Sequence, residues 1–192
     1  MTEEQDLIAR AQRGEVQAYE ALVRQYEQLA FRTAWLITHD EPEAADAAQE
    51  AFVRAYRALG SFKPGQPFRP WLLQIVTRQA LNHVQASQRR LKMTEHYAKQ
   101  MLNGPGHPSP ELNLATREQS ERLLQAVGKL SPDEQTLIAL RYFLELPEAE
   151  VAQSLRVRRG TIKSRLHRTL ARLREIIRRD FPDLNELTVF DD

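Results

Sequence analysis

The sequence predicts an all-α protein made of two small helical domains joined by a flexible linker, the C-terminal one a helix-turn-helix. Apolar residues recur every three or four positions through most of the 192 residues, and no long alternation typical of a strand is present. Glycine is scarce, at 7 residues, and aromatic residues are few. The stretch GPGHPSP, at 104–110, interrupts the helical pattern and predicts a break between the domains.

Composition and periodicity also set the expected domain boundaries. We expect an N-terminal domain over 1–92, a linker over 93–112, a helix-turn-helix domain over 113–178 and an acidic tail over 179–192. A linker of about 20 residues reaches roughly 70 Å when it is extended. Two turns of duplex DNA have roughly the same length, so this linker would let the two domains contact one duplex about two turns apart.

Three helices are predicted before the first loop that is rich in Gly and Pro. A capping box begins a short helix that Gly14 ends, and a long helix over 15–38 carries an apolar stripe. Pro42 opens a third helix over 41–62, whose acidic first half and basic second half suit the helix dipole. Its expected inner face consists of Ala45, Ala48, Phe52, Ala55, Tyr56 and Leu59.

The loop GSFKPGQPFRP, at 60–70, combines aromatic and basic residues and contains no acid. Such a loop can hold an unstacked base through ring stacking and phosphate contacts. The residues that could do so are Phe62, Lys63, Phe68 and Arg69. The alternative is that the two phenylalanine rings fill the core below the loop, and the sequence leaves both open.

A helix over 71–90 follows the loop, with Leu72, Ile75, Val76 and Ala80 on its apolar face. A second stripe along this helix contains amides and guanidinium groups and no carboxylate. These side chains are the ones that contact base edges and phosphates. The stripe therefore predicts nucleic-acid contact by Gln74, Arg78, Asn82, Gln85 and Arg89.

The second domain contains the clearest motif. Ser131-Pro132-x-Glu134 predicts the start of a scaffold helix, and 147–174 then predicts two helices with a turn at 156–158. The second of these helices begins near Arg159 and places its apolar residues on one face. The opposite face is polar and basic, as in a helix that enters the major groove of DNA. That face and its flanks supply Arg158, Arg159, Thr161, Lys163, Ser164, His167 and Arg168.

The charge distribution supports two separate phosphate-contacting surfaces. The chain has a net charge of only +1, but 51–94 and 151–174 each contain eight Lys or Arg residues and no Asp or Glu. A merely solvated helix face normally mixes both signs to gain pairs along the helix. Two acid-free basic segments separated by acidic ones therefore predict two surfaces for nucleic acid on one chain.

Several other classes of function are not indicated. The five histidines lack metal-ligand spacing, no phosphate-cradling glycine loop or nucleophile motif is present, and cysteine is absent. We therefore expect no catalysis, no metal and no cofactor. No apolar run approaches the 18 residues of a membrane span, and a cytoplasmic protein is the simplest expectation.

The run Gly160-Thr161-Ile162-Lys163-Ser164-Arg165-Leu166, after Glu148-x-x-Val151-Ala152-x-x-Leu155, resembles the C-terminal DNA-reading part of extracytoplasmic-function (ECF) sigma factors of the sigma-70 superfamily. That family usually has Gly at the position of Arg156. The order Asp46-x-x-Gln49-Glu50-x-Phe52 is similar to the family's helix that docks on RNA polymerase. Phe68-Arg69-Pro70-Trp71-Leu72 resembles the family's part that reads the −10 promoter element.

The resemblance implies a promoter-specificity subunit without enzymatic activity of its own. It implies contact of core RNA polymerase with Asp46, Gln49, Glu50 and Val53. It implies that the 60–70 loop and the 71–90 stripe bind the −10 element, and that the second helix of the helix-turn-helix binds the −35 element. Promoter DNA, core polymerase and an anti-sigma factor are the implied partners, with no membrane.

The sequence alone leaves two other interpretations of the function open. A polymerase-independent helix-turn-helix regulator would bind an operator tightly as the free protein, usually as a dimer. A helical adaptor would use its basic faces on acidic proteins and would show no salt-dependent DNA affinity.

Overall fold

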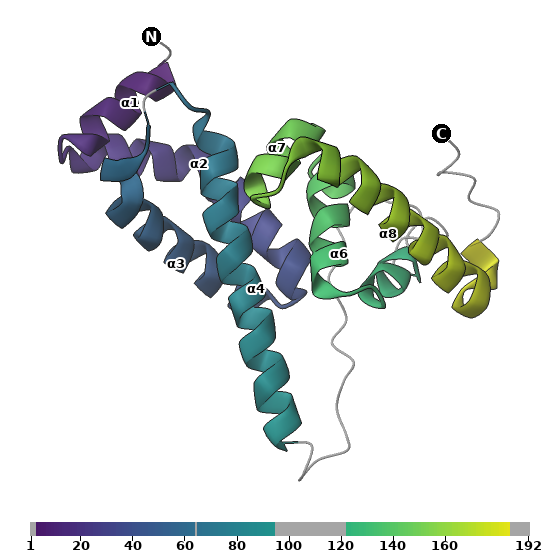
Figure 1. Ribbon diagram of the computed structural model, residues 1–192. Helices are drawn as coiled ribbons and strands as arrows, with labels where there is room; N and C mark the ends of the chain where they lie inside the picture. Colours follow the sequence, from purple (N-terminus) through teal and green to yellow (C-terminus); the bar gives the residue numbers. More distant parts are fainter. Residues whose placement is uncertain (1–2, 64, 95–121, 185–192) are drawn as a thin grey trace.

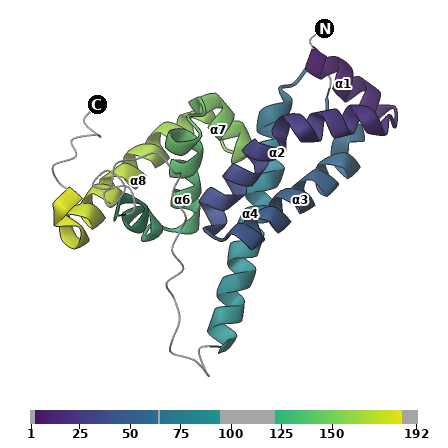
Figure 2. The same ribbon diagram turned by 180° about the vertical axis from the view of Figure 1, so that it is seen from behind.

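The computed structural model describes residues 3–63, 65–94 and 122–184, and these residues form helices and turns without a β-strand. Figures 1 and 2 show two helical lobes, one built from α1 to α4 and the other containing α6 to α8. The prediction of an all-α protein with two helical domains is therefore confirmed. The expected linker over 93–112 lies outside the described residues except for its first two positions, which belong to a helix.

The elements follow one another as short and long helices. In chain order they are α1 (Glu3–Gln12), α2 (Val16–Thr38), α3 (Glu41–Ala58), the 3₁₀ turn η1 (Leu59–Ser61), α4 (Phe68–Thr94), α6 (Pro132–Ile138), the π-helical turn η2 (Ala139–Phe143), α7 (Glu148–Ser154), α8 (Arg159–Asp180) and the 3₁₀ turn η3 (Pro182–Leu184). Residues 122–128 are also helical. None of these described helices is both long enough and apolar enough to cross a lipid bilayer.

The N-terminal lobe is a bundle in which α2, α3 and α4 pack on one another and α1 packs on α2. Helix α3 packs on its neighbours through small residues: it buries Ala44, Ala47, Ala48, Ala51 and Ala55. The predicted inner face of this helix was partly wrong, because Ala45 and Tyr56 are exposed. Alanines on several sides of a helix carry little information about which face is buried. The prediction therefore followed the larger residues of α3, and they indicated a face that is only partly the buried one.

Helix α4 is the longest element and connects the two lobes. Its first half packs in the bundle, its second half still contacts α3 as far as Arg90, and its C-terminal end projects beyond both lobes (Figures 1 and 2). It runs to Thr94, four residues beyond the predicted end at 90. Nothing in the sequence there stops a helix, since the next Gly or Pro is at 104.

The loop before α4 is anchored by aromatic rings. Phe62 and Phe68 are 4% and 1% exposed, and their ring centroids lie 5.7 Å apart. The ring of Trp71 lies 4.9 Å from Phe62 and 5.3 Å from Phe68. The side-chain amide of Gln12 donates to the carbonyl oxygens of Leu59 and Phe62, each at 2.9 Å. The rings and these bonds fix the loop on the bundle.

The predicted cap at Ser131 is present in the C-terminal lobe. The backbone N–H of Ser131 donates to the Glu134 carboxylate at 2.9 Å, which completes a capping box at α6. Residues 122–128 then pack with the end of α8 and with η3. Phe181 and Leu184 are buried in this core, so the first part of the expected tail over 179–192 belongs to the fold. Residues 185–192 lie outside the described part.

The two lobes contact each other through α4 and α7. A shared apolar cluster contains Leu73 of α4 and residues of the helix-turn-helix domain, namely Leu137, Leu140, Leu146, Val151, Ala152, Ile162 and Leu166. On the edge of the contact, Arg32 donates to the carbonyl oxygen of Phe143 at 3.1 Å, and His39 lies within hydrogen-bond distance of Gln135.

A polar network joins α3 to α4. The carboxylate of Glu43 accepts hydrogen bonds from His83, from the Ser87 hydroxyl at 3.2 Å and from Arg90 at 2.7 Å. The bond from His83 is the main reason that the pKa of Glu43 is lowered from its ordinary value of 4.5, with Ser87 and Arg90 adding to it. Because the folded-state pKa is the lower one, the ionised carboxylate stabilises the fold above pH 4.5, and this contribution disappears as the pH falls through the lowered pKa.

Substituting Glu43→Gln should lower the free energy of unfolding by about 1–2 kcal/mol at pH 7, because the side chain loses charge-assisted hydrogen bonds. Urea denaturation followed by circular dichroism measures this. The difference from the parent protein should shrink below pH 4.5. Glu41→Gln, which removes an exposed acid from the same first turn, is the matched control. Equal losses in the two variants would contradict the role of the network.

Candidate nucleic-acid interface

The second helix of the helix-turn-helix presents the predicted basic face to solvent. Ile162, Leu166 and Leu173 of α8 are buried and fix the helix on the domain. The opposite face therefore points outward. Six of the predicted −35 residues are exposed and Thr161 is half-buried, the six being Arg158, Arg159, Lys163, Ser164, His167 and Arg168.

This face has the geometry of a reading helix. Arg158 precedes the first turn of α8 in an extended conformation, and its carbonyl oxygen accepts from the N–H of Thr161 at 2.9 Å, so the side chain of Arg158 lies at the N-terminal end of the helix. The hydroxyl of Ser164 donates to the carbonyl oxygen of Thr161, and the Nε of Arg168 donates to that of Ser164 at 3.2 Å. These bonds stay within the helix, and the Arg168 side chain remains exposed. No carboxylate is present between Val151 and Arg174 to neutralise the face.

The turn between α7 and α8 contains a strained residue. Arg156 has a φ of 54°, in the left-handed region that residues with a Cβ disfavour. Its N–H donates to the Gln153 carbonyl oxygen at 3.2 Å, and the N–H of Val157 donates to that of Ala152 at 3.0 Å. The turn thus keeps the shape that glycine would adopt without strain.

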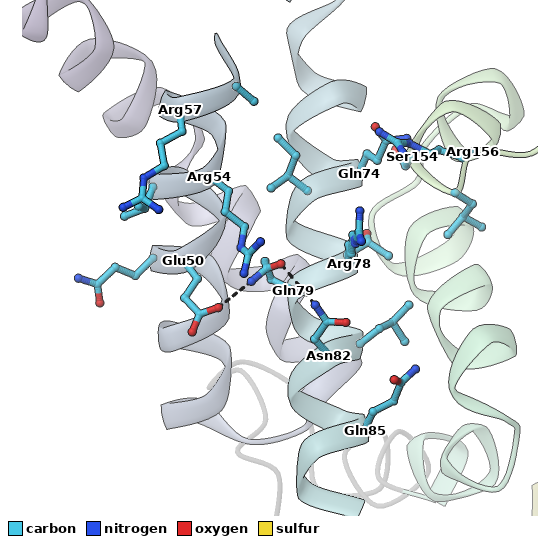
Figure 3. Close-up of a pocket in the computed structure, with 17 residues that line it drawn as sticks. Glu50, Arg54, Arg57, Gln74, Arg78, Gln79, Asn82, Gln85, Ser154 and Arg156 are labelled. Atoms are coloured by element: carbon cyan, nitrogen blue, oxygen red, sulfur yellow. Dashed lines mark hydrogen bonds between the residues drawn. The ribbon is translucent and has the colours of Figure 1, made fainter. Parts of the chain in front are cut away.

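The predicted −10 stripe on α4 is mostly accessible. Arg78, Asn82, Gln85 and Arg89 are exposed, as is Lys63 in the preceding loop. Asn82 lies 3.5 Å from the side-chain oxygen of Gln79. Figure 3 shows Arg78, Asn82 and Gln85 along one side of α4, with Gln74 near Ser154 and Arg156 of the helix-turn-helix.

Two predicted base-contacting residues are not available in this structure. Phe62 and Phe68 lie in the aromatic core described above, at 4% and 1% exposure, so neither ring face can stack on a base. The alternative that the sequence left open, that the rings fill the core, is the one observed. The two rings are buried because they gain more from packing their apolar surface on each other and on Trp71 than from exposure in a basic loop.

Two further −10 candidates already have partners in the other lobe. Arg69 donates to the carboxylate of Glu150, with its Nε at 2.8 Å and its Nη2 at 2.6 Å from one oxygen. The side-chain amide of Gln74 donates to the carbonyl oxygen of Gln153 at 3.2 Å. Both contacts join α4 to α7.

The predicted polymerase-facing residues share the outer side of α3. Asp46, Gln49 and Val53 are exposed, and Val53 leaves 46% of its surface open. Glu50 is also exposed, but its carboxylate accepts a hydrogen bond from buried Gln79 of α4 at 2.6 Å. Glu50 thus connects the outer surface of α3 to α4, the helix with the basic stripe (Figure 3).

A groove of about 1200 Å³ runs between α3, α4 and the turn of the helix-turn-helix. Its lining includes four arginines, Arg54, Arg57, Arg78 and Arg156, together with side-chain amides of α4. Glu50 is the only acid that lines it among the described residues. The groove is therefore suited to bind anionic groups of a nucleic acid.

Comparison with known proteins gives the family. The Sigma-70 region 2 model matches residues 22–90, and the Sigma-70, region 4 model matches residues 120–173. The RNA polymerase sigma-H factor of Pseudomonas aeruginosa is 34% identical over 176 residues, which are 88% of this chain and 91% of that protein. The ECF RNA polymerase sigma-E factor of Escherichia coli is 30% identical over 173 residues, 86% of this chain and 89% of that one. The chain belongs to the ECF sigma factors of the sigma-70 family.

Two solved structures share the fold of this ECF sigma factor. CnrH in complex with the cytosolic domain of CnrY has a TM-score of 0.66 and 22% identity, covering 92% of this chain and 98% of that one. The sigma factor RpoE in complex with the anti-sigma factor NepR from Bartonella quintana has a TM-score of 0.64 and 20% identity, covering 84% and 98%. Sigma factors initiate transcription and are not enzymes, which agrees with the lack of a catalytic motif.

Sequence reasoning missed three residues that organise the site of this sigma factor. Gln79 donates a hydrogen bond to Glu50, and Glu150 forms an ion pair with Arg69. Arg156 lines the groove. Only Arg156 left a signal in the sequence, as the departure from the glycine that the family usually has there. The roles of Gln79 and Glu150 depend on contacts over 29 and 81 residues of sequence separation, which no local pattern reports.

Substituting Arg156→Gly should raise the free energy of unfolding by about 0.5–1 kcal/mol. Glycine removes a left-handed strain of about 1–2 kcal/mol but adds freedom to the unfolded chain worth about 0.5–1 kcal/mol. Thermal or chemical denaturation measures the change. Arg158→Gly is the control, because its φ of −67° carries no such strain, and it should be neutral or destabilising. A lower stability of Arg156→Gly would show that the arginine side chain contributes more to the fold than the strain costs.

Proposed function

We propose that this sigma factor binds core RNA polymerase through α3 and directs it to promoters by contacts with the −10 and −35 elements. The observation that carries the proposal is the presence of two basic surfaces on separate lobes, one on α4 and one on α8, each formed by a stretch of sequence without Asp or Glu. Each is displayed by a helix whose other face is buried. A chain with two such surfaces can bind one duplex at two places.

The −35 element is proposed to be read by α8 in the major groove. Arginine and lysine bind guanine edges or phosphates, and the hydroxyls of Thr161 and Ser164 suit phosphates or bases. His167 and Arg168 lie one turn farther along the same face. Arg158 and Arg159 at the start of the helix are suited to fix its position on the backbone.

The −10 element is proposed to contact the loop and the stripe of α4. Lys63, Arg78 and Arg89 supply cations, and Asn82 and Gln85 supply amides that bond base edges. Arg69 and Gln74 join them when they leave their present partners. Phe62 and Phe68 support the loop from below rather than contacting a base.

Polymerase contact is proposed for the exposed side of α3, through Asp46, Gln49, Glu50 and Val53. Val53 is an exposed apolar residue among polar neighbours, which is typical of the centre of a protein contact. Tyr56, 45% exposed on the same helix, extends the apolar surface. The bond between Glu50 and Gln79 then connects the polymerase-binding helix to the DNA-binding one.

Two further features follow from this proposal. One fold relative, the sigma factor RpoE, was solved in complex with the anti-sigma factor NepR, and we propose that this chain also binds an anti-sigma factor. We also propose a cytoplasmic location, where polymerase and promoter DNA are found. Run-off transcription with and without this chain, on templates selected from a random library by the holoenzyme, tests the function. A polymerase-independent regulator or a protein adaptor would give no transcript in that assay.

Arg168→Ala should reduce promoter-dependent transcription roughly tenfold or more, because it removes a contact with a base or a phosphate worth about 1–3 kcal/mol. Binding to core polymerase should stay unchanged. Arg178→Ala removes the same charge from an exposed position farther along α8 and is the control. If Arg168→Ala transcribes as well as Arg178→Ala, the reading face is placed wrongly on α8.

Val53→Asp should weaken binding to core polymerase at least tenfold, because a buried, unpaired carboxylate replaces an apolar contact. Fluorescence anisotropy of a labelled chain titrated with core enzyme measures the affinity. Val16→Asp places the same change at another exposed valine, 52% open and outside α3. The proposal predicts normal polymerase binding for that control; equal loss in both variants would contradict a contact centred on α3.

A further inference from the structure

We propose that Gln79, a buried residue of α4, is a positioning residue that orients the side-chain amide of Asn82, so that this sigma factor selects a base with an amino group. The inference rests on the proposed function, because it names the chemistry of one contact with the −10 element. At the position that Asn82 contacts, it predicts adenine or cytosine rather than guanine or thymine.

Gln79 is a polar side chain that the fold buries, with 2% of its surface exposed. A buried amide costs free energy unless its donor and its acceptor both find partners. Its Nε2 donates to the carboxylate of Glu50 on α3 at 2.6 Å, and its Oε1 accepts from the Nδ2 of Asn82 at 3.5 Å. Figure 3 shows these two bonds as a chain that begins on α3 and ends at Asn82 on α4.

Glu50 sets the direction of this chain of bonds. A carboxylate that is ionised at neutral pH only accepts hydrogen bonds, so Gln79 must turn its NH₂ group toward Glu50. The other carboxylate oxygen of Glu50 lies 3.5 Å from the Nε2 of His83, which adds a second contact with α4. The Oε1 of Gln79 is therefore directed toward Asn82.

Asn82 takes its orientation from that oxygen. Its NH₂ group faces Gln79, because the reversed amide would bring two oxygen atoms together. The side-chain oxygen of Asn82 then lies on the side away from Gln79, at an exposed position that lines the groove (Figure 3). A base thus meets an acceptor at a fixed place, rather than either end of an amide that turns freely.

An acceptor in a fixed place distinguishes bases by their exocyclic groups. Adenine and cytosine carry the amino groups N6 and N4 on their major-groove edges, whereas guanine and thymine carry the oxygens O6 and O4 there. An amino group donates to the Asn82 oxygen, but a base oxygen would face it as a second acceptor. The cations Arg78 and Arg89 on the same helix are suited to phosphates, which carry no base identity.

Competitive transcription tests the proposal. Holoenzyme transcribes a pool of barcoded templates in which the −10 element of a promoter selected by the holoenzyme is randomised, and the transcripts are sequenced. Asn82→Ala identifies the position that Asn82 contacts, as the one whose base preference it removes. Each preference is a ratio within one reaction, so a loss of folded protein or of polymerase affinity cancels.

Three variants test the role of Gln79 at that position. Gln79→Met removes both bonds and keeps a buried side chain of similar size. Glu50→Gln lets either end of the new amide face Gln79, so the direction is no longer fixed. The double variant Glu50→Gln/Gln79→Glu exchanges the two groups, and the new carboxylate at position 79 accepts from the new amide and from Asn82. The matched control is Gln88→Met, which removes an exposed amide of α4 outside the stripe.

We expect the parent to prefer adenine or cytosine at this position roughly three- to tenfold, the range of one net hydrogen bond. Gln79→Met and Glu50→Gln should reduce the preference by about twofold or more. The double variant should restore it, because Asn82 keeps its orientation, and Gln88→Met should match the parent. Restoration by exchange separates an effect of hydrogen-bond direction from a merely structural role of Gln79.

Several results would overturn the proposal. Asn82→Ala could leave every position unchanged, or the position it identifies could prefer guanine or thymine in the parent. Gln79→Met could keep the parent preference, or the double variant could transcribe with the weakened preference of Gln79→Met. If the double variant yields no transcripts, the ratios of the two single variants decide. Failure of the proposed function gives a different result, since the parent holoenzyme would then yield no transcripts at all.

Discussion

The structure depends on two helices that bury one face and thereby commit the other face to solvent. In α8 the buried face contains Ile162, Leu166 and Leu173, and in the first half of α4 it contains Leu72 and Val76. Burial of each such side chain contributes roughly 1.5–3 kcal/mol. This apolar contribution sets the rotation of each helix about its own axis. The cations therefore point outward whether or not nucleic acid is present.

The lack of acids on these outer faces is meaningful because it is unfavourable for the free protein. Like charges three or four residues apart on a helix repel by a few tenths of a kcal/mol, and a few Glu residues would remove that repulsion. The acids are instead concentrated elsewhere, at the start of α3 and on α7. There Glu43 and Glu50 fasten α3 to α4, and Glu150 holds Arg69. These three acids thus join helices to one another, while Arg78, Arg89 and the cations of α8 stay exposed.

Features that depend on local sequence were predictable, and those that depend on distant residues were not. Gly14, Pro42 and the Ser131 cap gave the helix ends, and the spacing of leucines gave the buried face of α8. The prediction of the buried face of α3 was partly wrong, because alanines on several sides of the helix do not indicate which side is buried. Whether Phe62 and Phe68 face a base or the core could not be decided locally, because the answer depends on Trp71, on Tyr26 from α2 and on the bonds of Gln12 across the loop.

The contact between the lobes was the least predictable feature, and it changes how the basic surfaces are understood. A sequence reports that Arg69 and Gln74 are suited to bind acceptors, but it does not say which acceptors they meet first. A surface selected to bind phosphates and base edges will also bind carboxylates and carbonyl groups of the same chain when these can be brought close, since the hydrogen-bond chemistry is the same. The intramolecular competitor needs only a small free energy of its own, because its effective concentration is high. In this structure Arg69 and Gln74 meet acceptors of α7, the Glu150 carboxylate and the carbonyl oxygen of Gln153, because the fold places α7 on α4.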